Sequence, residues 1–207
     1  DLWDDQKYFI DAICGIVREK RVDAVLLAGD VYDRSVPAAS AIGLYDYAMN
    51  RLCGELGVKV LTIAGNHDSA ERLASCAGLL DKAGLYLPGA AQREPRVVEF
   101  ADSQVFFLPW MTEEKIKSLY PEERDGITDL TEAYRVAVNH MREKFIPGKH
   151  HLLLSHAFIT NAETSTSDRA AEIGFATQVP ASVFEGFDYV ALGHIHKPQK
   201  CTRDTLR

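Results

Sequence analysis

Four short apolar runs, each followed by polar residues, constrain the fold of this chain more than any other feature. The polar stretches are Gly29-Asp30, Gly65-Asn66-His67-Asp68, Ser155-His156 and Gly193-His194-Ile195-His196. Short apolar runs that end in a turn residue predict buried strands. A helical pattern separates the first two runs, so we expect a parallel strand–helix–strand unit with Asp30 and Asn66 as neighbours. In α/β sheets the carboxyl edge of the strands is where ligands usually bind.

Helical patterns and a hairpin fill the segments between these strands. Apolar residues recur at helical spacing over residues 4–20, from Pro37 toward Gly57, and over residues 129–145. Asp129 and Glu132 form a capping-box pattern at the start of the last of these helices. Residues 97–100 and 104–108 are two strand-like runs with a short polar gap, which predicts an antiparallel hairpin. The sequence therefore predicts an α/β fold.

Composition excludes several classes of protein. The chain has 207 residues, of which 46% are hydrophobic and 26% are charged, the balance of a globular protein with a full core. No apolar run approaches the ~18 residues of a membrane span, and the N-terminal residues lack a signal-peptide pattern. We therefore expect a cytoplasmic protein that makes no membrane contact. The net charge of −7 argues against a strongly basic nucleic-acid binder, although carboxylates that hold cations contribute to it.

The cysteines and several other residues have ordinary explanations. The four cysteines include no C-x-x-C pair, which fits neither a disulfide scaffold nor a thiolate zinc site. His140 lies on the polar side of a helix, and His150 and His151 begin a strand, so all three are interpreted as surface residues. Trp110 follows a strand and is more often a core or loop anchor than a base-stacking platform. The Ser- and Thr-rich stretch 160–176 is expected to be a solvated loop, with phosphate or DNA contact as the alternative.

The polar motifs supply mixed oxygen and nitrogen donors. Asp, Asn and His side chains together suit manganese, iron or zinc better than calcium. Glycine before a donor residue permits a sharp turn or a close backbone approach. On an extended strand, His194 and His196 would face the same side and serve two neighbouring ions. Two ions about 3.5–4 Å apart support phosphoryl displacement, so metal-assisted hydrolysis is inferred, with unrelated polar turns as the alternative.

The order of these motifs resembles the calcineurin-like metallophosphoesterases. More narrowly, the chain resembles the SbcD-type family of bacterial nuclease subunits in the segments Gly29–Pro37, Asn66–Leu73, Leu108–Trp110 and Asp188–Gln199. The resemblance covers nearly the whole chain. It implies a four-layer fold in which two mixed β-sheets lie between helices, and one metallophosphoesterase domain over residues 1–207.

The resemblance also implies a set of metal ligands. It implies two divalent ions, most commonly Mn²⁺, that are bridged by Asp30. Asn66, His156 and His194 would complete the ligands of one ion, and His196 would contribute to the other.

Three further residues receive other roles from the resemblance. His67 would stabilise the transition state and protonate the leaving oxygen rather than bind metal. Asp68 would orient the His67 ring, and Asp33 matches a family site position whose role is less defined.

The chain departs from the family at both ends. The family begins with an Asp-x-His motif at the end of a first strand, and no such motif precedes Asp30. We therefore expect that strand to be missing and the first metal, left with Asp30 and His196, to bind weakly or not at all. The family also continues beyond Gly-His-x-His into a capping region that positions DNA, so the chain is expected to be incomplete at both termini.

Three functions are compatible with the sequence. The resemblance implies a metal-dependent DNA nuclease of repair, recombination and replication. It would be a 3′–5′ exonuclease on double-stranded ends and an endonuclease on single strands or hairpins. Its partners would be DNA, an SbcC-type coiled-coil ATPase and a second copy of the chain. The alternatives are a phosphatase or phosphodiesterase acting on a small molecule or phosphoprotein, and a metal-poor, inactive scaffold.

Overall fold

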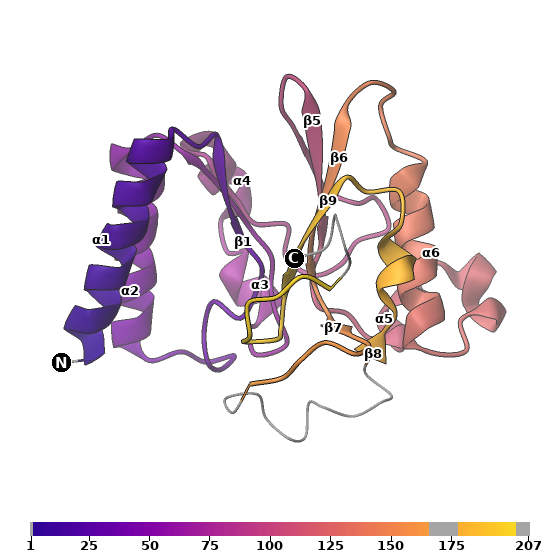
Figure 1. The fold of residues 1–207 in the computed structure, drawn as a ribbon. Helices are drawn as coiled ribbons and strands as arrows, with labels where there is room; N and C mark the ends of the chain where they lie inside the picture. Colours follow the sequence, from indigo (N-terminus) through magenta and orange to yellow (C-terminus); the bar gives the residue numbers. More distant parts are fainter. Residues whose placement is uncertain (1, 166–177, 202–207) are drawn as a thin grey trace.

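The computed structural model describes residues 2–165 and 178–201, which form four layers (Figure 1). Helices α1 (Leu2–Lys20) and α2 (Ala39–Met49) form one outer layer, over a first sheet. A second sheet lies beside the first, and helices α5 (Glu113–Leu119) and α6 (Leu130–Arg142) form the opposite outer layer. The predicted helix–sheet–sheet–helix architecture is confirmed.

The first sheet is parallel throughout its described strands. It has the order β1 (Ala24–Leu27), β2 (Lys59–Thr62), β3 (Leu85–Tyr86). Helix α2 connects β1 to β2, and the short helices α3 (Ala70–Leu73) and α4 (Ala77–Leu80) connect β2 to β3. Helical crossovers join parallel strands, so mixed pairing, which was expected for both sheets, does not hold for this one. Helix α1 begins at Leu2, so β1 is the first strand of the described residues.

The second sheet is mixed, as predicted. Its order is β4 (Val97–Glu99), β5 (Ser103–Leu108), β6 (His150–His156), β9 (Tyr189–Gly193). The first two strands form the predicted antiparallel hairpin, whereas β5, β6 and β9 are parallel to one another. The register places His156 opposite Gly193. A separate parallel pair, β7 (Phe158–Ile159) and β8 (Gln178–Val179), follows β6.

Each interface between layers has its own hydrophobic core. Cys14, Val17 and Val60 belong to the cluster between α1, α2 and the first sheet. Leu61, Phe107 and Leu154 belong to the cluster between the two sheets, and Phe106, Tyr134 and Leu153 to the cluster under α6. Neighbouring residues such as Val60 and Leu61 belong to different clusters because successive side chains of a strand point to opposite faces.

The helices follow their sequence signals, with one exception. The carboxylate of Asp129 accepts the N–H of Glu132 at 2.9 Å and caps α6, whose buried stripe includes Tyr134. Helix α2 is shorter than the predicted 37–57 pattern, because a π-helical turn over Asn50–Glu55 replaces its end. Short 3₁₀ turns occupy Asp81–Ala83, Pro121–Gly126 and Ala181–Phe184.

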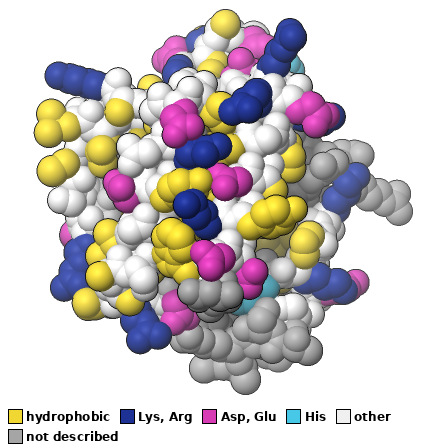
Figure 2. All heavy atoms as spheres, turned by 90° about the vertical axis from the view of Figure 1, so that its left-hand side faces the viewer, with side chains coloured by type: hydrophobic (Ala, Val, Ile, Leu, Met, Phe, Trp, Pro, Cys, Tyr) yellow, Lys and Arg dark blue, Asp and Glu magenta, His cyan; other side chains and the backbone are white. Residues whose placement is uncertain are grey.

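The outer face of α1 and α2 carries exposed hydrophobic side chains among charged ones (Figure 2). Phe9, Ile16 and Ile42 are about half exposed or more. Within residues 2–165 and 178–201, none of the helices combines the length and apolarity needed to cross a bilayer. Most of the Ser- and Thr-rich stretch, residues 166–176, lies outside the described residues.

Candidate metal centre

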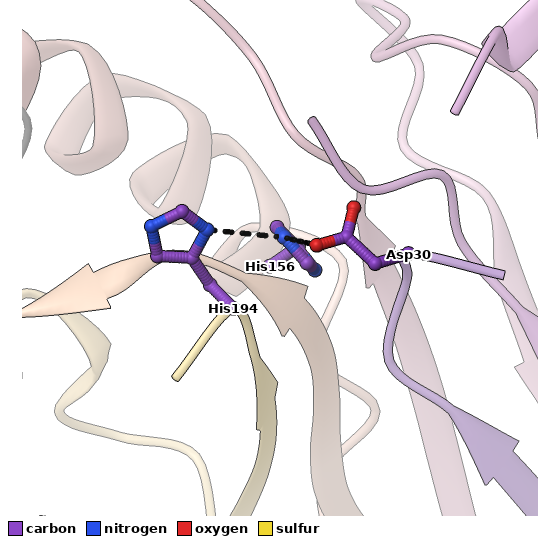
Figure 3. A group of neighbouring side chains, drawn as sticks. All are labelled: Asp30, His156 and His194. Carbon is purple, nitrogen blue, oxygen red and sulfur yellow. Dashed lines mark hydrogen bonds and ion pairs between the residues drawn. The ribbon is translucent and has the colours of Figure 1, made fainter. Parts of the chain in front are cut away.

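Four strand ends bring their polar residues together between the two sheets. β1 leads to Asp30, β2 leads to Asn66, β6 ends at His156 and β9 leads to His194. Figure 3 shows Asp30, His156 and His194 pointing toward one another from three of these strand ends. Asp30 and Asn66 are therefore neighbours, as predicted. Within each sheet, parallel strands carry their carboxyl ends to the same edge.

The donor atoms of this group are close enough to share one ion. His156 Nε2 lies 2.9 Å from Asn66 Oδ1 and 3.3 Å from Asp30 Oδ2. His194 Nδ1 lies 3.0 Å from Asn66 Oδ1 and 3.3 Å from His156 Nε2. Asp30, His156 and His194 each offer a ligand atom within 4.8 Å of the others. His156 is fully buried and His194 is 9% exposed, so water screens the group weakly.

The tautomer of His156 indicates that the group fits a cation. Its Nδ1 lies 2.7 Å from the backbone carbonyl oxygen of Ala28, which can only accept a hydrogen bond. Nδ1 therefore carries the proton, and in the neutral ring Nε2 directs its lone pair at the oxygens of Asp30 and Asn66. Electron-rich atoms that face one another in a buried site need a proton or a metal ion between them. The mixed oxygen and nitrogen set suits manganese, iron or zinc.

Asp30 is held as a carboxylate at neutral pH. Burial, the largest single influence, raises the pKa of Asp30. When a proton rather than a metal ion lies between His156 Nε2 and Asp30, hydrogen bonding and charge from His156 and His67 outweigh burial and lower the pKa below its ordinary value. One of these bonds is donated by the backbone N–H of His67 to Asp30 Oδ1 at 3.0 Å. The backbone of Asp30 has a φ of 49°, in the left-handed region that Asp tolerates better than most residues.

Three glycines allow the strand ends to approach this closely. A Cβ atom at Gly65 would collide with the carboxylate of Asp30, and one at Gly29 would collide with the imidazole of His156. A Cβ atom at Gly193 would collide with the carbonyl of Ala28. The expectation that glycine precedes the donors for reasons of close approach is confirmed.

Asp68 connects the first two strand ends. Its carboxylate accepts backbone N–H groups of Val31 at 3.1 Å, Tyr32 at 2.9 Å and Gly65 at 2.9 Å. Two of these donors lie in the turn after β1 and the third lies in the turn after β2. The described contacts of Asp68 thus hold two backbone turns together. The orientation of the His67 ring by Asp68, which the resemblance implies, stays a prediction.

The ring of His67 has a different described neighbour. His67 Nδ1 lies 3.0 Å from the backbone carbonyl oxygen of Asp33. The side chain of Asp33 is at the surface, where its carboxylate accepts a bond from Arg34 at 3.0 Å. Asp33 therefore contacts the predicted proton carrier through its main chain, which residue type alone does not indicate.

His196 lies apart from the buried group. It is exposed, and it does not belong to the cluster of Asp30, His156 and His194 that the described residues form. The extended strand on which His194 and His196 would share one side does not continue to these residues, because β9 ends at Gly193 and His194 has a φ of 97°. The turn at His194 ends the alternation of an extended strand.

Trp110 lies against the site, whereas the sequence favoured a core or loop anchor over a base-stacking platform. Its ring stacks on His194 with a centroid distance of 5.5 Å and an interplanar angle of 19°. It also meets the ring of His156 edge-on, at 6.1 Å and 84°. The signal that could have revealed it is its position directly after Leu108-Pro109, at the end of a strand that pairs with the His156 strand.

Comparison with known proteins gives two findings. The family model described as "Calcineurin-like phosphoesterase" matches residues 1–198. A curated protein of Staphylococcus epidermidis, the SbcD subunit of the nuclease SbcCD, is 30% identical over 197 residues. The alignment covers 95% of this chain and 52% of that relative, so the chain spans about half of the relative's length.

Proposed function

This chain belongs to the calcineurin-like phosphoesterase family, and from that premise we propose that it is the phosphodiester-hydrolysing part of an SbcD-type DNA nuclease subunit. The observation that carries the proposal is the convergence of Asp30 and Asn66 from the first sheet with His156 and His194 from the second. The similarity to a nuclease subunit over 95% of the chain supports DNA as the substrate.

Asp30, Asn66, His156 and His194 would hold a divalent cation, for which we propose Mn²⁺. When bound, the cation would supply Lewis-acid charge that stabilises the negative charge developing on a phosphoryl group. The proton on His156 Nδ1, which faces the Ala28 carbonyl, keeps Nε2 available as a ligand atom. The ionised carboxylate of Asp30 would bridge this ion to a second one.

We propose that the second ion binds weakly to this chain. This is the ion called the first metal above, for which the resemblance implies Asp30 and His196 as donors, and His196 lies at the surface outside the buried group. A site with few protein ligands holds a divalent ion loosely. We therefore expect one tightly held ion and a second that exchanges readily.

His67 would act as the proton carrier. The contact of Nδ1 with the Asp33 carbonyl places a proton on that nitrogen and leaves Nε2 as the atom that exchanges a proton with the substrate. His67 would then donate its Nε2 proton to the leaving oxygen of the cleaved phosphodiester.

The proposed partners are DNA, an SbcC-type coiled-coil ATPase and a second copy of the chain, in the cytoplasm. The name of the S. epidermidis relative identifies it as one subunit of the SbcCD nuclease, which supports the ATPase partner. The exposed Phe9, Ile16 and Ile42 on the outer helices support a protein contact there.

Cleavage of hairpin DNA and of bis(p-nitrophenyl) phosphate, each with Mn²⁺, tests the proposal. We expect the chain to cut the hairpin and to lose this activity in chelator. Hydrolysis of the small ester without DNA cleavage would favour a phosphodiesterase acting on other substrates. If the chain neither binds Mn²⁺ nor hydrolyses either substrate, a scaffold role is the better account.

A further inference from the structure

Trp110 contacts three of the four strand ends that carry the donor residues. Its backbone N–H donates to the carbonyl of Ala64 at 2.9 Å, two residues before Asn66. Its ring stacks on His194 and meets the edge of His156. The residue therefore joins the end of the first sheet to two imidazoles of the second sheet.

His194 needs such support more than the other donors do. Its φ of 97° lies in a region that side-chain-bearing residues rarely adopt, so the local backbone does not favour the observed position. Contacts of the side chain then keep the ring in place, among them the polar contact of Nδ1 with Asn66 Oδ1 at 3.0 Å and the packing of neighbouring aromatic rings. Phe158 contributes a tilted contact at 5.7 Å and 48°, whereas Trp110 contributes a nearly parallel one at 5.5 Å. Stacking fixes the plane of a ring as well as its distance.

We propose that Trp110 is a positioning residue that presets the His194 and His156 rings for a divalent cation. This inference rests on the proposed function in one respect, the role of His194 as a metal ligand. Trp110 acts through the imidazoles and touches neither the ion nor the scissile phosphodiester. Its removal weakens cation binding because the His194 ring loses the surface that fixes its plane.

A platform for a nucleobase is the alternative role of an aromatic residue near a nuclease site. A base platform must present an open face, and the face of Trp110 toward His194 is covered by the imidazole. The two roles differ in what they change. A platform alters the KM for DNA, whereas a positioning residue alters the Kd for the cation in the absence of DNA.

Mn²⁺ binding to three variants tests the proposal, with free Mn²⁺ measured by electron paramagnetic resonance and no DNA present. Trp110→Leu fills similar space without an aromatic face, and its Kd should rise about 10-fold or more, as for other residues that orient metal ligands. Trp110→Phe restores a stacking ring and should stay within about 3-fold of the native Kd. Trp3→Leu, on helix α1, is the matched control and should leave the Kd unchanged.

A Kd for Trp110→Leu equal to that of the native chain overturns the inference, as does an unchanged Kd with a raised KM for DNA. Failure of the native chain itself to bind Mn²⁺ overturns the proposed function, which separates the two failures.

A second measurement does not depend on the stability of Trp110→Leu. In the Trp3→Phe variant, Trp110 is the sole tryptophan. Titration with Co²⁺ should quench its fluorescence. Half of the quenching should be reached at the Co²⁺ concentration at which the Co²⁺ absorption bands reach half of their full intensity. Binding of Co²⁺ without quenching overturns the inference.

Discussion

Replacement of Asp68 by Ala should loosen the two turns that carry Asp30 and Asn66. The Asp68 carboxylate accepts three backbone N–H groups, from Val31, Tyr32 and Gly65. A hydrogen bond to a charged group contributes about 1.5–3 kcal/mol, so three give at most about 4.5–9 kcal/mol. Water can reach these partly buried donors after the substitution. We therefore expect the free energy of unfolding to fall by about 2–4 kcal/mol.

Asp68→Asn should have a smaller effect in the same direction. An amide keeps one acceptor oxygen, which can still serve Val31 and Gly65, the two donors that Asp68 Oδ2 serves. Its NH₂ group would face the N–H of Tyr32, which loses its acceptor. We expect the free energy of unfolding of Asp68→Asn to fall by about 1–3 kcal/mol. Its stability should therefore lie between those of the native chain and Asp68→Ala.

The assay combines urea unfolding with Mn²⁺ binding. Both Asp68 variants should weaken Mn²⁺ binding, by about 10- to 100-fold for Asp68→Ala, because the turns position the ligands. Asp129→Ala is the matched control, because it removes the acceptor of one backbone hydrogen bond, from the N–H of Glu132, at the start of α6. It should lower the free energy of unfolding by about 1 kcal/mol and leave the Mn²⁺ affinity unchanged. If Asp68→Ala resembles Asp129→Ala in both measurements, the reasoning about Asp68 is refuted.

Four further predictions concern the site and the surface. His67→Ala should keep Mn²⁺ bound but abolish DNA cleavage, and loss of the ion would contradict the role of His67 as a proton carrier. His194→Ala should weaken Mn²⁺ binding more than His196→Ala does, and equal losses in a titration would contradict the buried site. Free Mn²⁺ at 100 times its Kd should raise the free energy of unfolding by about 2.7 kcal/mol, which chelator reverses in thermal melts. The hydrogen bond from Arg93 holds the pKa of Glu122 below its ordinary 4.5, so this contribution to stability is present above that pH and is lost as the pH falls through the lowered pKa. In Glu122→Gln, the free energy of unfolding should therefore depend less steeply on pH below about 4.5. An unchanged slope of this free energy against pH would contradict a stabilising Arg93–Glu122 pair.

The donors were predictable from sequence because their signals are local. A buried strand that ends in Gly-Asp or Gly-Asn-His-Asp shows both the element and the exit of the side chain within a few residues. Parallel pairing then follows from the helix between Asp30 and Asn66, so the edge they share was deducible as well. The hairpin of β4 and β5 and the cap at Asp129 are equally local.

The remaining features depend on contacts between distant residues. The carboxylate of Asp68 acts on N–H groups 36 and 37 positions earlier, and nothing near Asp68 in the sequence indicates these donors. Trp110 is recognisable as part of the site only once the second sheet sets it against His194. The placement of His196 is another example, because residue alternation does not indicate that β9 ends at Gly193.

Gly29, Gly65 and Gly193 lie at three strand ends, and each is in close contact with a neighbouring strand end. A methyl group at any of them would press on a group that belongs to a different strand end, namely His156, Asp30 or Ala28. A first alanine would force these ends apart, and a second would enter space already opened. The two penalties would then sum to less than their separate values. A double-alanine variant at two of these glycines should consequently lose less stability than the two single variants together.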